Sequence, residues 1–173
     1  MISETQKRYI IWQNRAFQFY LAARLLYKNE QYSPAAFCSI QALESLMKGT
    51  LVYWDKSFNP KAANHSIASM LRTIKNKVKN YNAFVCPTYF YEDQRFQLVT
   101  RYPANGKGVL IPGSFLNDLD TAFSNLIMLV PFQFNSRLKH ALSGKKKTDL
   151  NILRHKNNQV RALRKYLNVR LTK

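Results

Sequence analysis

Apolar residues recur along this chain at alternating steps of three and four, the spacing that places side chains on one face of an α-helix. The first such stripe comprises Tyr9, Trp12, Ala16, Phe19, Ala23 and Leu26. The second comprises Ala36, Ile40, Leu43, Met47 and Leu51. Ser33 and Pro34, just before the second stripe, are typical of a helix start. The pattern therefore predicts helices over residues 4–29 and 34–54.

Three further helices are predicted before residue 131. Their stripes are Ile67, Met70, Leu71, Ile74 and Val78, then Tyr91 and Leu98, then Leu116, Leu119, Phe123, Leu126 and Val130. The Gly- and Pro-containing stretch 103–113 predicts a loop before the last of these helices. Ser114 is the expected N-cap of that helix, with Asp118 and Asp120 near its positive end. Pro131 should end or kink that helix, because an internal proline loses a backbone hydrogen bond.

A final amphipathic helix is predicted near the C-terminus, capped at Thr148 or Asp149. Its apolar positions are Leu150, Leu153, Val160, Leu163 and Leu167. The expected fold class is therefore all-α, and we expect residues 1–136 to form a helical bundle and residues 137–173 a basic helical extension, which we call the tail.

Composition supports one compact chain. The 173 residues are 46% hydrophobic, enough for a buried core. Two distant cysteines predict neither a disulfide framework nor a cysteine metal site, and we expect a cytoplasmic protein without a membrane span. The few acids suggest ordinary helix-end electrostatics, so no metal site and no cofactor are predicted.

Charge is the feature that points to a partner. The chain has 27 Lys and Arg against 9 Asp and Glu, a formal charge of +18. Twelve of these basic residues lie in the tail, against the single acid Asp149. So dense a cluster of one sign repels itself, and it is typical of proteins that neutralise phosphates. A merely solvated basic face, an acidic protein partner and an anionic membrane surface are the alternatives.

Four short motifs, in this order, resemble the HEPN family of helical domains. They are Ala22-Ala23 before Leu25-Leu26, Gln41-Ala42-Leu43-Glu44 with Lys48, His65-Ser66-Ile67, and Arg101-Tyr102-Pro103, within a stretch from about residue 6 to 130. The resemblance implies an up-down bundle of about five helices, frequent homodimers, and RNA or nucleotide handling, often in toxin–antitoxin or defence modules.

One departure from the family bears on catalysis. Many RNA-cleaving members have an Arg and a His separated by four to six residues. The His exchanges protons with the RNA while the Arg stabilises the charge on the phosphate. No Arg stands at that distance before His65, His140 or His155. We therefore predict no catalytic residues, and keep as an alternative a divergent ribonuclease that uses His65 or His140 across a dimer cleft.

The candidate ligand-binding residues come from the motifs, the loop and the tail: His65, Arg101, Lys107, Lys145, Lys146, Lys147, Arg154, Arg161 and Lys165. His65 could instead cap or pack at a helix start, and Arg101 could bind the carbonyls that end its own helix. Glu44 and Lys48, four apart, predict an ordinary helical ion pair.

The leading hypothesis is a helical protein that binds RNA or a nucleotide-bearing partner through these residues without the usual nuclease motif. The third hypothesis, beside the divergent ribonuclease, is an interaction subunit that neutralises an acidic protein, for instance a nucleotidyltransferase encoded next to it.

Overall fold

The fold is all-α in the residues that the structure describes. A computed structural model places residues 2–63, 65–78, 86, 90, 113–131 and 136–169. The helices are α1 (Glu4–Lys28), α2 (Tyr32–Trp54), α3 (Ile67–Lys77), α5 (Phe115–Met128), α6 (Arg137–Ser143), α7 (Lys147–Arg154) and α8 (Val160–Tyr166). None of these helices is long and apolar enough to cross a membrane.

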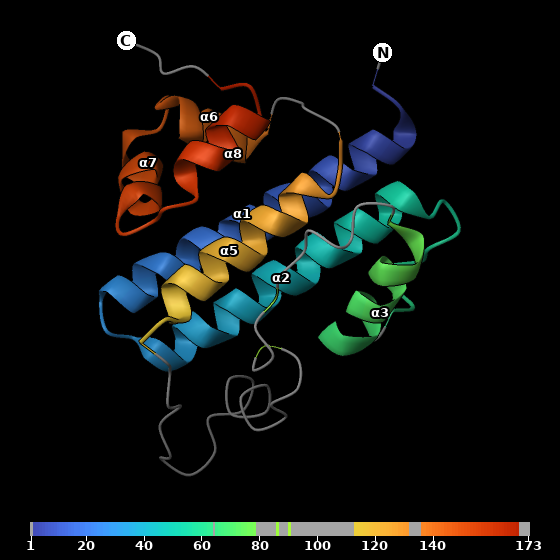
Figure 1. The fold of residues 1–173 in the computed structure, drawn as a ribbon, viewed down its shortest axis with the longest axis horizontal. Helices are drawn as coiled ribbons and strands as arrows, with labels where there is room; N and C mark the ends of the chain where they lie inside the picture. Colours follow the sequence, from blue (N-terminus) through green and yellow to red (C-terminus); the bar gives the residue numbers. More distant parts are fainter. Residues whose placement is uncertain are drawn as a thin grey trace.

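Helices α1 and α2 form a long hairpin at the centre of the molecule (Figure 1). A capping box fixes the start of α1, because Ser3 Oγ accepts from the Gln6 amide while Gln6 Oε1 accepts from the Ser3 amide. Gly49 lets the two helices approach closely, since a Cβ at that position would lie 2.9 Å from the Cβ of Trp12. The hairpin provides the frame against which the other helices pack.

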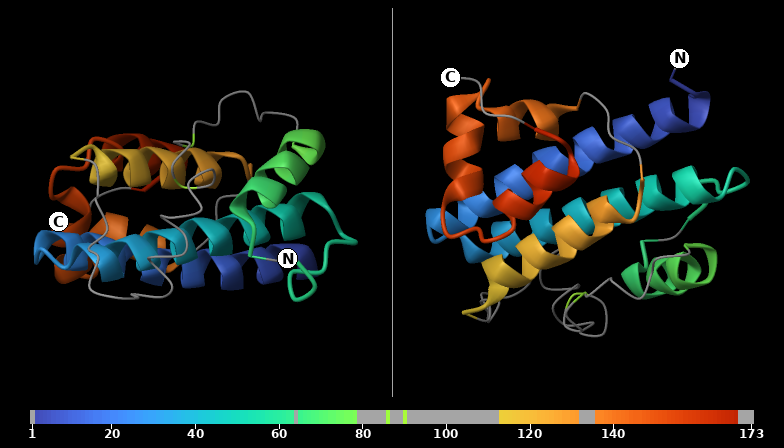
Figure 2. Two further views of the ribbon diagram at one scale, coloured as in Figure 1. Left: turned by 90° about the horizontal axis from the view of Figure 1, so that it is seen from below. Right: turned by 45° about the horizontal axis from the view of Figure 1, so that its top comes forward.

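Helix α5 lies along this hairpin, and α3 packs against α2 on another side (Figures 1 and 2). The apolar stripes predicted for α2, α3 and α5 are all buried, as predicted. Between α1 and α5 the rings of Tyr20 and Phe123 stack with centroids 4.0 Å apart. One hydrophobic cluster runs through these helices, and α5 ends at Met128, before Pro131.

The tail differs from the single helix that was predicted. Its described residues form three short helices, α6, α7 and α8, linked at Gly144 and at residues 155–159. The second break follows from Lys156, whose φ of 48° is incompatible with a continuing helix, and from Asn157, whose Oδ1 accepts from the Gln159 amide at 2.9 Å. All five predicted apolar positions are nevertheless buried.

The described tail shares its core with the hairpin and α5. Leu138, Leu142, Leu153, Leu163 and Leu167 belong to the same hydrophobic cluster as the stripes of α2 and α5. Helices α6 and α7 contact α1, and α8 contacts α5. The division into two domains at residue 136 stays a prediction, but the leucines bind the tail to the bundle.

Several predicted details of the helix ends were wrong. Helix α2 begins at Tyr32, before Ser33-Pro34, and no side chain caps it. Ser114 is the N-cap residue of α5, but its hydroxyl donates to Asp118 at 2.7 Å and caps no amide. Helix α7 begins one residue before Thr148, with Lys146 as its N-cap residue.

Candidate nucleic-acid interface

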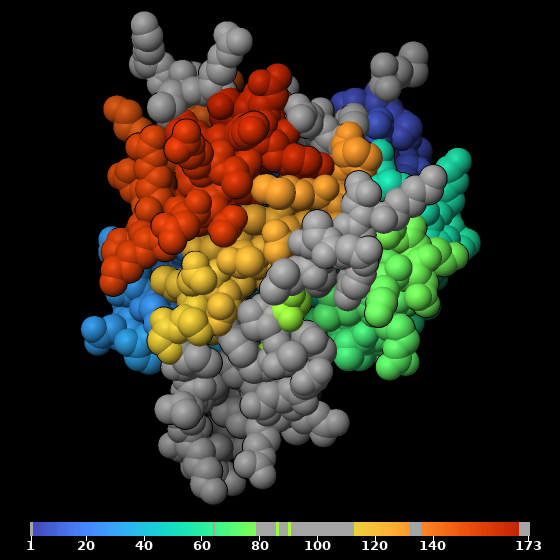
Figure 3. All heavy atoms as spheres, viewed as in Figure 1, coloured from blue at the N-terminus to red at the C-terminus, as the bar shows by residue number. Residues whose placement is uncertain are grey.

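The described tail presents its basic residues to solvent. Figure 3 shows this segment as one continuous surface over α5 and α1. Six of the residues predicted to bind a ligand lie on it and are exposed: Lys145, Lys146, Lys147, Arg154, Arg161 and Lys165. Within the described part of the chain, no Lys or Arg of the tail forms an ion pair with an acid. Their charge is therefore available to an external anion.

The fold of the tail explains this arrangement. Its leucines are drawn into the core, so the intervening basic positions of α7 and α8 face outward. Gly144 ends α6 with a left-handed φ of 89°, which turns the chain so that Lys145, Lys146 and Lys147 lead into α7. Arg154 stands in the last turn of α7, where a cation is favourable beside the helix C-terminus.

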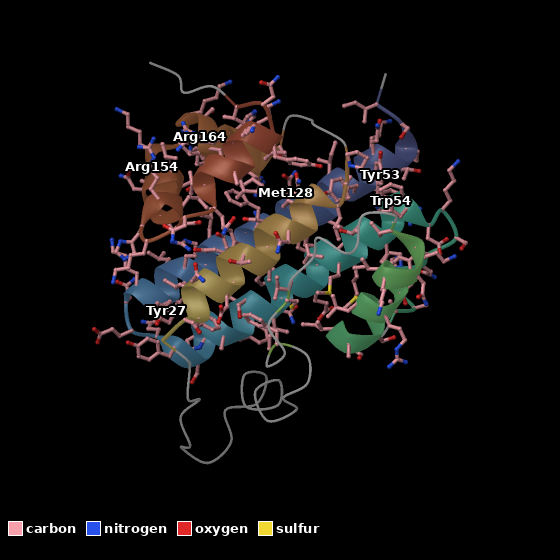
Figure 4. The ribbon with its side chains drawn as sticks, in the orientation of Figure 1. Tyr27, Tyr53, Trp54, Met128, Arg154 and Arg164 are labelled. Carbon is pink, nitrogen blue, oxygen red and sulfur yellow. The ribbon has the colours of Figure 1, made fainter. Side chains whose placement is uncertain are left out.

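Arg164 adds a positive group that the sequence analysis did not single out. Its Nε donates to the carbonyl of Leu142 at 3.0 Å, joining α8 to α6. Burial, and then the positive charge of Arg154, lower the pKa of the Arg164 guanidinium from its usual value. Figure 4 labels both arginines on the tail, Arg154 on α7 and Arg164 on α8. An anion bound beside them would relieve this repulsion.

A surface hollow of about 570 Å³ lies beside Arg164. Its lining residues are Asn157, Asn158, Val160, Arg161, Arg164 and Val169. Guanidinium and amide groups are common donors to phosphate and sugar oxygens. The hollow therefore extends the basic surface with hydrogen-bond donors.

A buried polar cluster attaches the tail to the bundle. Arg24 of α1 forms a buried ion pair with Asp120 of α5, and Tyr20 donates to the same carboxylate at 2.5 Å. Burial raises the pKa of the Asp120 carboxyl, and the charge and hydrogen bonds of Arg24 oppose the rise. The interpretation of Asp120 as an acid at a helix end was therefore wrong, because it is a buried partner of Arg24.

The same cluster reaches across to α7 and to the link between α7 and α8. Arg24 Nε donates to the carbonyl of Ile152 at 3.1 Å, and its Nη2 donates to the carbonyl of His155. Asn157 Nδ2 donates to the hydroxyl of Tyr20 at 2.9 Å. The two bonds from Arg24 satisfy carbonyls at the end of α7 that accept no hydrogen bond within the helix. The basic surface is thus held in a defined position relative to α1.

The predicted pair of Glu44 and Lys48 is present, with Lys48 Nζ 2.9 Å from Glu44 Oε1. It is more than a surface pair, because both side chains are buried and Lys48 also lies over the ring of Trp12 at 5.9 Å. His65 Nδ1 lies 2.7 Å from the same carboxylate oxygen, while its side chain is 64% exposed. Ser66 caps α3, so His65 is not the capping residue.

The predicted ligand-binding residues do not form one cluster. Figures 1 and 2 place α3, which follows His65, and the tail on opposite sides of the molecule. Arg101 and Lys107 lie outside the described residues, and so does the helix predicted over 88–102 apart from Phe90. No group of three or more His, Cys, Asp or Glu able to hold a metal ion occurs among the residues placed by the structure.

The model of the HEPN domain family matches residues 9–105 of this chain, more than half of its length. No curated protein and no solved structure matches the chain. The family match covers α1 from Tyr9 onward, α2 and α3, with Glu44, Lys48 and His65. Helix α5 and the basic tail lie beyond it.

Proposed function

This chain belongs to the HEPN domain family, and from that premise we propose that it binds RNA through the exposed basic surface of its tail. The observation that carries the proposal is the set of exposed Lys and Arg residues that lack an acidic partner within the described part of the chain. Phosphate neutralisation with release of counterions is the physical gain that such a surface offers.

We propose binding without RNA cleavage by the usual family motif. His65 stands beside Glu44, far from the tail, and no Arg occurs five to seven residues before it in the sequence. A homodimer and a place in a toxin–antitoxin or defence module belong to the same proposal, because the family resemblance implies them. A cytoplasmic location belongs to it because the two distant cysteines predict no disulfide framework. An acidic partner protein would compete with RNA for the same surface.

The test is the affinity of a labelled single-stranded RNA measured over a series of salt concentrations, with gels that follow the integrity of the RNA. We expect intact RNA and an affinity that falls steeply with salt. Replacing Lys145, Lys146 and Lys147 with Ala should weaken binding and lower the slope of log affinity against log salt by roughly 2. Deleting residues 145–173 would be a poorer test, because it removes buried leucines.

The matched control removes the same charge elsewhere. Lys56, Arg72 and Lys75 are exposed and lie near α3, away from the tail. Their replacement with Ala should leave the slope nearly unchanged. Equal effects of the two triple variants would show that only net charge matters, and RNA cleavage that His65→Ala or His140→Ala abolishes would favour a ribonuclease instead.

A further inference from the structure

A half-buried pocket lies between α1 and the turn from α6 to α7. Its volume is about 210 Å³, below the roughly 300 to 1,000 Å³ of pockets for drug-sized ligands. Its lining residues include Arg137, His140, Lys146 and Asp149 of the tail with Phe17 and Gln18 of α1. The pocket therefore suits a small charged group, and most of its polar residues lie beyond the family match.

The chain holds these residues in place through backbone contacts. The Arg137 amide donates to Asn14 Oδ1 of α1 at 3.1 Å, and Ser136 Oγ caps α6. Arg137 and His140 are three apart on α6 and therefore share one face. The left-handed turn at Gly144 then brings Lys146 and Asp149 to the same pocket.

The polar groups of the pocket divide into two kinds. Arg137, Lys146 and His140 donate hydrogen bonds to a phosphate, and the guanidinium can do so with two parallel bonds. Asp149 accepts hydrogen bonds, so it repels a phosphate beside it but can accept from a ribose hydroxyl. Gln18 can both donate and accept, as the edge of a base requires.

We infer that this pocket binds the phosphorylated end of an RNA strand, with Arg137, His140 and Lys146 on the terminal phosphate and Asp149 on a ribose hydroxyl. A terminal phosphate carries up to two negative charges near neutral pH, whereas a phosphate within the strand carries one. Phe17, only 1% exposed, lines the pocket together with Leu21, and a pocket of this small volume suits the end of a strand better than a strand that passes through it. This inference rests on the proposed RNA binding and adds an end preference to it.

The test compares three RNA oligonucleotides of one sequence, with a 5′-phosphate, with a 3′-phosphate, and with hydroxyl groups at both ends. The full-length protein should bind one phosphorylated form about tenfold more tightly than the hydroxyl form, as one charge-assisted bidentate contact allows. Arg137→Gln combined with His140→Gln should remove that difference. The matched control, Arg161→Gln combined with Lys165→Gln on α8, should weaken all three RNAs and keep their ratio.

The outcomes separate this inference from the proposed function. Equal affinity for all three RNAs would overturn the end preference and leave RNA binding intact. If no RNA binds, the proposed function fails, and the pocket is then tested alone with a ribonucleoside monophosphate. Changes in the NMR signals of the His140 ring, absent in Arg137→Gln, would support the pocket, and unchanged signals would overturn it.

Discussion

At the scale of single residues, the buried ion pair of Arg24 and Asp120 is the clearest case in which one side chain serves several elements. Arg24 contacts α5 through Asp120 and the end of α7 through two carbonyls. Polar groups at such depth are stable only when their hydrogen bonds are made. The position of the tail therefore depends on a residue in the first helix.

Replacing Arg24 with Met should lower the free energy of unfolding by about 3 to 5 kcal/mol, because it leaves a buried carboxylate without its counter-charge. Asp120→Leu should lower the free energy of unfolding by a similar amount, because it leaves the buried guanidinium of Arg24 without its counter-charge. The double variant should cost clearly less than the sum, since both charges leave together. Denaturant unfolding of the four proteins measures this coupling.

The exposed pair of Lys7 and Glu4 provides the contrast for that cycle. Lys7 Nζ lies 3.7 Å from Glu4 Oε2, and both side chains are mostly exposed. Lys7→Ala should change the free energy of unfolding by less than about 1 kcal/mol. A similarly small effect of Arg24→Met would show that the buried pair contributes little to stability.

Burial also controls the chemistry of the thiols. It raises the pKa of Cys86 to about 12 from a usual value of 9.0, and it raises the pKa of Cys38 as well. Because the thiolate is the reactive form, Cys86 should be alkylated very slowly at pH 8 in the folded protein. The unfolded chain loses this proton at lower pH, so Cys86 should reduce stability as pH rises from about 9 to 12.

Mass spectrometry of iodoacetamide labelling against time and pH measures this protection. The guanidinium-unfolded protein is the control, in which both cysteines should react at similar rates. Labelling of Cys86 at pH 8 as fast in the folded protein as in the unfolded one would contradict the burial of its thiol.

At the scale of elements, the periodicity predicted α2, α3 and α5 well because each packs one apolar stripe into the core. Helix α1 was predicted less well. Its buried set includes Tyr9, Ala16 and Ala23 of the stripe, but also Gln13 and Arg24. Since α1 contacts α2 on one side and the tail on another, its buried surface is wider than one stripe and includes polar residues that periodicity does not detect.

In the tail and the candidate site too, the sequence pattern did not detect features that depend on tertiary contacts. The sequence identified the exposed basic residues, because charge density needs no tertiary information. It did not identify the break after α7, where Asn157 bonds to Tyr20 from a distant helix. Arg164 and the pocket at Arg137 and His140 were also missed, because they depend on contacts of α8 with α6 and of α6 with α1.

The turn between α6 and α7 depends on one glycine. Gly144 has a φ of 89°, which is unfavourable for residues with a Cβ. Gly144→Ala should therefore lower the free energy of unfolding by about 1 kcal/mol or more, measured by denaturant unfolding. It should also weaken binding at the pocket, whose residues Lys146 and Asp149 follow the turn.

Gly113 offers a matched control for this variant. A Cβ added there would meet no atom within 4 Å, and its backbone φ lies outside the left-handed region. Gly113→Ala should leave the free energy of unfolding within about 0.5 kcal/mol of the parent protein. Equal effects of the two variants would argue against a strained turn at Gly144.

At the scale of the whole molecule, the described structure has one main hydrophobic core. The leucines beneath the basic surface share this core with the helices of the family match. Trp54 Nε1 donates to the carbonyl of Leu129 at 2.9 Å, and Tyr166 of α8 donates to the carbonyl of Met128 at 3.3 Å. The end of α5 thus contacts both the hairpin and the tail. We infer that the tail unfolds together with the bundle.

This inference predicts the effect of a tail substitution on a probe in the bundle. Leu163 of α8 is fully buried, so Leu163→Ala should lower the free energy of unfolding by about 2 to 5 kcal/mol. The loss should appear in the fluorescence transition of Trp12 and Trp54, which lie on α1 and α2. Leu43→Ala in α2 is the matched variant. Both variants should unfold in a single transition, at lower denaturant concentration than the parent protein. If Leu163→Ala leaves the Trp transition unchanged, the tail folds independently of the bundle. An independently folding tail could not hold the pocket residues of α6 and α7 against α1.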